Sequence, residues 1–185
     1  RYKKGKFINN PTLHPESSPI SIIYYVSTEK IPYLSIIMPI HNQENVIAVH
    51  IKSIFTCTIE MSYELILLLD ACSDKTEQHI VEELQKQTAV PELCTSIMIC
   101  KSETPLFETT CDNIGLYCAK GTYVIEIQAD MEMTEKGYNQ RLLQPFVKDN
   151  MIIGISGRCC HGLKNNSGVG KLGTTIEQPL PNNIP

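Results

Sequence analysis

Residues 112–130 read DNIGLYCAKGTYVIEIQAD, a helical segment, a glycine, an apolar strand and then an acidic residue. Gly121 is a typical helix stop, and the run at residues 123–127 is typical of a buried strand. Ligands of α/β sheets bind just beyond the carboxyl ends of the strands. The passage therefore predicts an α/β fold and places Asp130 at a ligand site.

The residues around Asp130 favour a metal ion. If extended backbone continues past the strand, Gln128, Asp130 and Glu132 fall at alternate positions and face the same side. Two carboxylates and an amide suit a hard divalent cation, because such cations prefer oxygen ligands. We therefore expect Asp130 and Glu132 to be metal ligands.

Strands and helices alternate along the rest of the chain. Apolar runs predict strands at residues 34–38, 64–69, 96–100, 123–127 and 151–156. Apolar spacing and capping signals predict helices at residues 46–57, 75–87, 104–120 and 138–147. This alternation predicts a Rossmann-like, mainly parallel sheet with helices on both faces.

The chain divides into three parts by composition. Residues 1–33 are polar, proline-punctuated and basic at the start, which predicts an extended arm whose apolar patch at residues 20–26 pairs or packs locally. Residues 34–157 form the α/β domain. Residues 158–185 are rich in Gly, Asn and Pro and predict an irregular tail.

Composition limits the class of protein. A net charge of −4 and a pI near 5.7 argue against a nucleic-acid partner. No apolar run approaches the roughly 18 residues that span a bilayer. The eight cysteines form no C-x-x-C pair, which argues against a zinc ribbon and favours reduced thiols. Reduced thiols are typical of a cytoplasmic or intracellular protein. Any association with a membrane is expected to involve parts of the protein that are not in this sequence. Cys111 and Cys118 are expected to act as small core residues.

Three strand ends carry polar residues that would meet at one edge of the sheet: residues 39–44, 70–74 and 128–132. Singly, each has a simpler explanation; Asp74, for example, is best explained as a helix cap. Together they describe a nucleotide site, with a ring for a base, a carboxylate for its N–H and a metal ligand for a diphosphate.

Four sequence motifs follow one another along these segments. They are P-x-aromatic-N-E-E, D-D-G-S-x-D-x-T, the pair A-R-N-x-G and A-x-G-x-Y, and D-x-D. The matching segments are residues 39–44, 69–76, 111–115 with 119–123, and 128–130.

Over residues 34–132 the chain thus resembles the nucleotide-sugar-binding half of a family 2 glycosyltransferase, which has the GT-A fold. The resemblance implies that His41 lies near the nucleobase, Asp70 accepts a hydrogen bond from it, and Gln128 lies near the ribose. It implies that Asp130 holds Mg²⁺ or Mn²⁺ against the donor diphosphate, with Glu132 as a second metal-side group. The other nucleotide-binding residues that it implies are Pro39, Ile40, Asn42, Glu44, Asn113, Gly115 and Ala129.

The chain departs from the family pattern at three places. Gln128 replaces the first acid of D-x-D, which removes a negative charge beside the metal unless Glu132 compensates. Asp112 stands where relatives often carry arginine, and Ala71 stands where they carry glycine.

The resemblance implies a metal-dependent glycosyltransferase of the hexosyltransferase type. It would move a sugar from a nucleotide-diphosphate donor, with UDP-sugar expected, to a hydroxyl acceptor (glycan, lipid or protein) with inversion. Inverting relatives use a general base, often in an E-D pair, but only Asp149 and Glu177 are acidic after residue 140. The catalytic base is therefore unassigned, and we expect an incomplete acceptor part that starts within residues 158–185. The first alternative is an inactive nucleotide-sugar-binding or interaction module. The second is a nucleotidyltransferase of similar fold, although residues 41–44 do not resemble the glycine-rich loop of such enzymes.

Overall fold

The computed structural model describes residues 6–7, 20–86 and 91–157. The chain forms two compact units, residues 1–141 and 142–185. The strands are β1 (Lys6–Phe7), β2 (Ile20–Ser27), β3 (Leu34–Ile40), β4 (Tyr63–Asp70), β5 (Cys94–Ser102) and β6 (Tyr123–Glu126). The helices are α1 (Ile47–Cys57), α2 (Thr76–Lys86), α3 (Glu108–Cys118) and α4 (Tyr138–Lys148).

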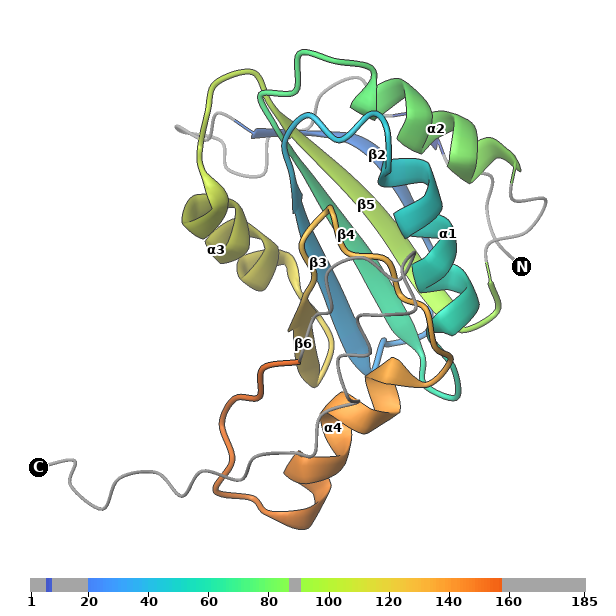
Figure 1. Ribbon diagram of the computed structural model, residues 1–185, viewed down its shortest axis with the longest axis vertical. Helices are drawn as coiled ribbons and strands as arrows, with labels where there is room; N and C mark the ends of the chain where they lie inside the picture. Colours follow the sequence, from blue (N-terminus) through green and yellow to red (C-terminus); the bar gives the residue numbers. More distant parts are fainter. Residues whose placement is uncertain (1–5, 8–19, 87–90, 158–185) are drawn as a thin grey trace, which may run out of the picture. The chain divides into compact units, whose positions relative to one another are not determined.

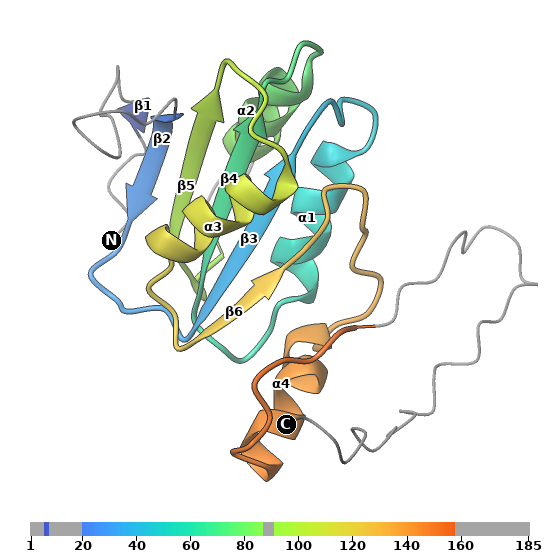
Figure 2. The same ribbon diagram turned by 90° about the vertical axis from the view of Figure 1, so that its left-hand side faces the viewer.

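The strands form one sheet in the order β1-β2-β5-β4-β3-β6. Strands β3, β4, β5 and β6 run parallel, whereas β2 runs antiparallel to β5 and β1 antiparallel to β2 (Figure 2). Every residue of β3 and β4 is buried, as expected for central strands that are covered on both faces. The predicted mainly parallel α/β sheet is confirmed.

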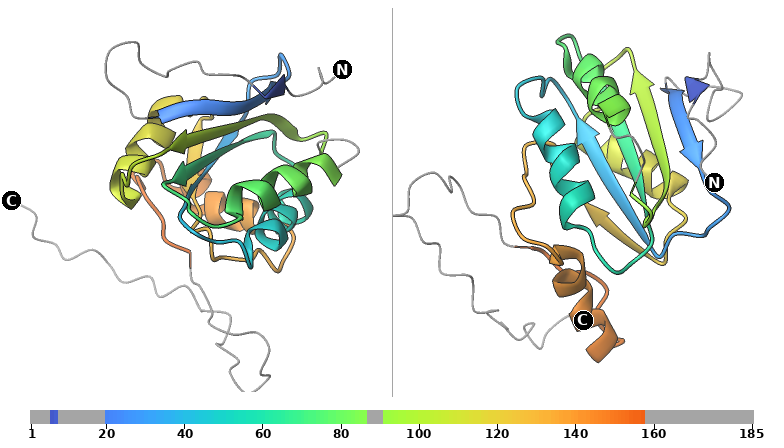
Figure 3. Two further views of the ribbon diagram at one scale, coloured as in Figure 1. Left: turned by 90° about the horizontal axis from the view of Figure 1, so that it is seen from above. Right: turned by 90° about the vertical axis from the view of Figure 1, so that its right-hand side faces the viewer.

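Helices cover both faces of the sheet. Helices α1 and α2 lie on one face and α3 on the other (Figures 1 and 3). On the α3 face, Cys100 and Cys111 belong to the buried core, and Cys118 packs against it. The predicted core role of Cys111 and Cys118 is therefore confirmed.

The sheet extends further toward the amino terminus than the apolar pattern predicts. Residues 20–27 form β2, which pairs with residues 96–102 of β5, far away in the sequence. The apolar patch of the predicted arm thus pairs locally with β1, as predicted, and also with a distant strand. The sheet begins before residue 34.

The predicted start of the third helix at Thr104 is wrong, because α3 begins at Glu108. The backbone N–H groups of Leu106 and Phe107 donate to the Asp70 carboxylate, and Phe107 has a φ of 65°. That left-handed conformation is incompatible with an α-helix, so helical backbone starts only after Phe107.

The predicted strand at residues 151–156 is also wrong, since residues 152–157 form no helix or strand. Ile153 is 99% exposed. A strand needs a partner edge for its backbone groups, and an apolar run by itself does not provide one. The predicted tail at residues 158–185, with Glu177, lies outside the described residues. Within the described residues, no helix combines the length and apolar character that crossing a bilayer requires.

Candidate nucleotide site

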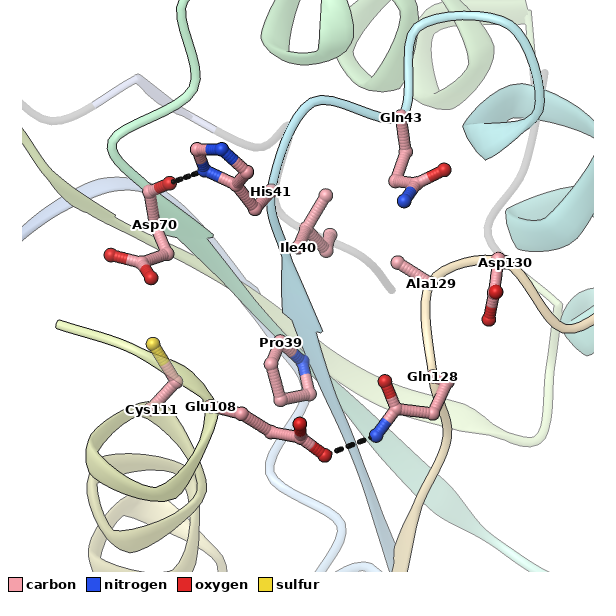
Figure 4. A pocket seen from close by; sticks show the side chains of 10 residues that line it. All are labelled: Pro39, Ile40, His41, Gln43, Asp70, Glu108, Cys111, Gln128, Ala129 and Asp130. Carbon is pink, nitrogen blue, oxygen red and sulfur yellow. Dashed lines mark hydrogen bonds between the residues drawn. The ribbon is translucent and has the colours of Figure 1, made fainter. Parts of the chain in front are cut away.

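A pocket lies where β3, β4 and β6 end and α3 begins (Figure 4). It brings together four segments that are far apart in the sequence, at the edge of an α/β sheet where ligand sites are expected. Its lining residues are Pro39, Ile40, His41, Gln43, Asp70, Glu108, Cys111, Gln128, Ala129 and Asp130.

His41 is held in place by the neighbouring strand end. Its Nδ1 lies 2.6 Å from the Asp70 carbonyl oxygen. Because a carbonyl only accepts, Nδ1 carries the hydrogen. The Asn42 amide then donates to His41 Nε2 at 3.2 Å, and Asn42 Oδ1 accepts from the Ser73 N–H at 2.8 Å. The ring is thus oriented by bonds on both of its nitrogens.

The loops after β3 and β4 are further joined by reciprocal hydrogen bonds. The Glu44 N–H donates to Asp74 Oδ2 at 3.1 Å, and the Lys75 N–H donates to Glu44 Oε2 at 3.0 Å. Asp74 Oδ1 also accepts the Thr76 N–H at 2.9 Å, which confirms the predicted cap of α2. Glu44 therefore braces two loops and does not line the pocket.

Asp70 is buried at the end of β4 and connects three elements. Its two carboxylate oxygens accept the N–H groups of Leu106 and Phe107 at 2.7 and 2.9 Å, and its carbonyl accepts from His41. A carboxylate offers about four acceptor positions, so two bonds leave capacity for a ligand. Asp70 can therefore organise the pocket and still accept a hydrogen bond from a base.

Gln128 is oriented by two acidic side chains. Its Nε2 donates to Glu108, which begins α3, and to Glu126 Oε1 at 3.0 Å. Carboxylates only accept, so the amide nitrogen must face them and the amide oxygen remains for a ligand (Figure 4). The pocket therefore presents a neutral acceptor at residue 128, with the Glu108 carboxylate beside it.

The acidic side chains near Gln128 raise the pKa of their neighbours. Burial and then the charges of Asp112 and Glu108 raise the pKa of Glu126. Burial and the charge of Glu108 likewise raise the pKa of Asp112, one of whose oxygens is buried and has no hydrogen-bond partner among the described residues. This part of the site favours a neighbour that carries positive charge.

Cys111 is a buried thiol in the pocket wall. Burial, followed by the charges of Asp70, Asp112 and Cys72, raises the pKa of Cys111 to about 12. The thiol therefore stays protonated at neutral pH, which argues against a nucleophilic role.

Asp130 is an exposed carboxylate to which no other described residue donates a hydrogen bond or forms an ion pair. In the described part of the chain, no group of three His, Cys, Asp or Glu side chains could hold a metal ion. Mg²⁺ commonly binds through one or two carboxylates together with substrate phosphates and water. One free carboxylate in the pocket fits that manner of binding.

The structure gathers most of the predicted site residues. Seven of them line the pocket: Pro39, Ile40, His41, Asp70, Gln128, Ala129 and Asp130. Five do not: Asn42, Glu44, Asn113, Gly115 and Glu132.

Besides Asn42 and Glu44, two of the residues outside the pocket interact with groups elsewhere. Gly115 lies against the Ile37 side chain, where it allows α3 to approach β3 closely. The charge of Glu132 acts on the Cys57 thiol of α1 and raises its pKa, although burial contributes more. The role of Glu132 as a metal ligand stays a prediction.

Three lining residues were not among the predicted site residues: Gln43, Glu108 and Cys111. Gln43 and Cys111 lie inside the motif segments, so their positions in those motifs were a usable signal. Glu108 lies before its motif, and no sequence pattern marks it.

Backbone strain is concentrated at this edge of the sheet. Four described residues other than glycine have a positive φ, and three of them, Asn42, Ala71 and Phe107, lie at the strand ends around the pocket. Such conformations persist where the surrounding structure enforces them, and they often occur at functional sites. Ala71 also adopts the conformation that the glycine of D-D-G would adopt without strain.

The family described as Glycosyl transferase family 2 matches residues 35–178 of the chain. No curated protein matches the chain.

Solved structures share the fold. A mannosyltransferase, PcManGT from Pyrobaculum calidifontis in complex with GDP-Man and Mn²⁺, is 16% identical with a TM-score of 0.54, over 64% of this chain and 33% of that one. TarS of S. aureus is 18% identical with a TM-score of 0.50, over 69% of this chain and 23% of that one. TarS 1-349 is 20% identical with a TM-score of 0.50, over 69% and 37%. The chain thus spans between about a quarter and two fifths of these proteins.

Proposed function

The chain belongs to glycosyl transferase family 2, and we propose that it forms the donor-binding part of a metal-dependent glycosyltransferase. The donor is a nucleotide-diphosphate sugar, with UDP as the preferred nucleotide, and the acceptor is a hydroxyl group of a glycan, lipid or protein. Transfer proceeds with inversion at the sugar carbon.

One observation carries this proposal. His41, Asp70, Gln128 and Asp130 come from three separate segments and line a single pocket at the carboxyl edge of the sheet. The family resemblance assigns these four residues to the base, the ribose and the metal, and their convergence supports that assignment. The structure with GDP-Man and Mn²⁺ adds support from a protein of the same fold.

The charge of the pocket supports the dependence on a metal ion. Asp70, Glu108 and Asp130 are acidic, and none of the ten lining residues is Lys or Arg. A nucleoside diphosphate is itself strongly negative, so it would be repelled from these carboxylates. A bound Mg²⁺ or Mn²⁺ would offset that repulsion and act as a Lewis acid for the leaving diphosphate. Asp130 would hold the ion, and the Gln128 amide oxygen would accept from a ribose hydroxyl.

The size of the pocket limits what it encloses. Its volume is about 170 Å³, whereas ligand pockets commonly measure about 300–1,000 Å³. It therefore suits one part of a donor, and a pyrimidine base fits such a space more easily than a purine. The sugar and the acceptor then extend beyond the ten lining residues.

Thermal denaturation with nucleotides tests the donor assignment. We expect UDP with Mn²⁺ to raise the melting temperature more than GDP or ADP, because ligands that bind only the folded state stabilise it. EDTA or Asp130→Ala should abolish the shift. Glu82→Ala, which removes an exposed carboxylate on α2, is the matched control and should preserve it. If no nucleotide shifts the melting temperature with either cation, the proposed function fails.

A second measurement separates an enzyme from an inactive binding module. The chain spans a minor part of the structures that it resembles. Of the two acidic residues after residue 140, Asp149 accepts a hydrogen bond from the Met151 N–H, and the catalytic base is unassigned. Steady release of sugar from the donor supports an enzyme, and the anomer formed, followed by NMR, tests inversion. Nucleotide binding without sugar release or transfer supports the module.

A further inference from the structure

Helix α1 holds the segment after β6 through one of its faces. His50, Ser53 and Cys57 are three and four residues apart, so they lie above one another on the helix. All three bond to the main chain of residues 129–133, which forms no helix or strand. These side chains therefore replace the backbone ladder that a strand would provide.

The contacts of Ser53 and Cys57 are both made to Met133. The Met133 N–H donates to Ser53 Oγ at 3.0 Å, and the Cys57 thiol donates to the Met133 carbonyl at 3.1 Å. Met133 is therefore fixed on both sides of its backbone, and the far end of the segment cannot shift along α1 without breaking both bonds.

The contact of His50 is made to the residue before Asp130. His50 Nδ1 lies 2.6 Å from the carbonyl oxygen of Ala129, and both residues are buried, at 6% and 4% exposure. A carbonyl only accepts, so His50 donates. This carbonyl belongs to the planar peptide unit that joins Ala129 to Asp130. Its direction therefore sets the direction in which Asp130 leaves the chain.

We propose that His50 is a positioning residue that sets where the Asp130 carboxylate meets a divalent cation, an inference that rests on the proposed function. No described residue holds the Asp130 side chain itself, so its position depends on the backbone that carries it. Without the imidazole, the buried Ala129 carbonyl loses its donor, and the peptide unit gains freedom to rotate. The carboxylate then spends less time where the cation binds.

A second histidine provides a matched control. His79 of α2 makes the same kind of bond, from Nδ1 to the Glu44 carbonyl at 2.7 Å. Neither His79 nor Glu44 lines the pocket. His79→Leu therefore removes an equivalent bond from a loop that does not carry Asp130. A purely structural role for His50 would make the two leucine variants behave alike.

The test is a titration of the full chain with Mn²⁺ at saturating UDP, with free Mn²⁺ measured by electron paramagnetic resonance. We expect His50→Leu to weaken Mn²⁺ binding by about tenfold, the lower end of the effects seen when partners that orient metal ligands are removed. His50→Asn should bind nearly as well as the wild type, because its amide nitrogen can donate from the place of Nδ1. His79→Leu should bind Mn²⁺ like the wild type.

Each other outcome counts against the inference. Wild-type affinity in His50→Leu, or an equal loss in both leucine variants, overturns the role of His50 while leaving the proposed function intact. A wild-type chain that binds neither UDP nor Mn²⁺ overturns the proposed function and this inference together. If His50→Leu does not fold, His50→Ala, which also removes the donor to the Ala129 carbonyl, takes its place, and wild-type Mn²⁺ affinity in that variant overturns the inference.

Discussion

Strand β4 has a buried carboxylate at each end, and the two have different surroundings. Glu64 near the amino end is 2% exposed, and Asp70 at the carboxyl end is 8% exposed. Neither forms an ion pair with another described residue. Both are instead satisfied by hydroxyl or backbone N–H donors, as buried charges must be when they have no cationic partner.

The amino-end carboxylate ties together the sheet itself. Glu64 accepts from the Ser35 hydroxyl at 2.6 Å, the Ser96 hydroxyl at 3.2 Å and the Lys120 N–H at 2.6 Å. These donors come from the two neighbouring strands and from the turn before β6. The Asp70 carboxylate holds only the approach to α3 and has a pocket beside it. Burial and bonding are therefore alike at the two ends of β4, whereas only Asp70 lies at the edge where α/β sheets bind ligands.

Glu64→Ala should give the largest effect and should change stability alone. It leaves two buried hydroxyls and the Lys120 N–H without their acceptor, at roughly 1–3 kcal/mol for each group left unsatisfied. Because hydroxyls can turn to other acceptors, we expect a total loss of about 3–4 kcal/mol. Urea denaturation measures it. UDP affinity of the folded fraction should stay near the wild-type value, and a selective loss of UDP affinity would contradict the comparison.

Asp70→Ala should lower both stability and binding. The N–H groups of Leu106 and Phe107 lose their acceptor, which we expect to cost about 2 kcal/mol, and the base loses its partner. Calorimetric titration with UDP and Mn²⁺ should detect no binding at concentrations that saturate the wild type. Asp70→Asn keeps one acceptor oxygen and should recover part of the stability. If Asp70→Ala binds UDP normally, the two ends of β4 do not differ as described.

Gly121→Ala tests the amino end through packing. A Cβ at residue 121 would lie 2.6 Å from the Ser35 nitrogen and 2.7 Å from the Leu34 carbonyl carbon, which are backbone atoms that cannot turn away. Overpacking of this kind costs about 1–3 kcal/mol, and we expect about 2 kcal/mol in urea denaturation. Gly115→Ala is the control, because the three atoms nearest to its Cβ all belong to the Ile37 side chain rather than to the backbone. An equal or larger loss in Gly115→Ala would show that the backbone at Ser35 can move.

The two ends of the sheet also differed in what could be predicted. Buried strands are visible as apolar runs, and the carboxyl ends of neighbouring parallel strands must meet, so the sheet and the convergence of His41, Asp70 and Asp130 followed from local patterns. The hydrogen-bond partners of Glu64 did not follow, because they come from three distant segments. The start of α3 was missed for the same reason: Asp70 holds Leu106 and Phe107 from another strand.

Pairing between strands that are far apart in the sequence also limited how much of the fold could be predicted. The pairing of residues 20–27 with β5 depends on an open edge that no local pattern reveals. The apolar run at residues 151–156 shows the converse, since it has the composition of a strand but no described partner edge. Glu108 reaches Gln128 only because α3 begins at that residue. A site residue at the start of a helix can therefore be predicted only if the first residue of that helix can be predicted.

Asp74→Ala should give the smallest effect, and one that depends on pH. Burial alone would raise the pKa of Asp74, but hydrogen bonds from the Thr76 hydroxyl and from the N–H groups of Thr76, Glu44 and Asp74 itself outweigh it and lower the pKa. A carboxyl group whose pKa is lower in the folded state stabilises the fold above its unfolded pKa of about 3.9. That stabilisation is lost as the pH falls through the folded pKa.

We therefore expect Asp74→Ala to lose about 1 kcal/mol at pH 7, as is typical for a helix cap. The difference from the wild type should narrow as the pH falls below about 4, because the wild-type carboxyl becomes protonated there. Urea denaturation at several pH values measures both. Asp149→Ala, which removes a carboxylate of the second unit, is the control for general acid effects. If the difference in free energy of unfolding between Asp74→Ala and the wild type stays constant well below about pH 4, the charge of Asp74 contributes nothing. The loops beside Asp70 would then be held without that charge.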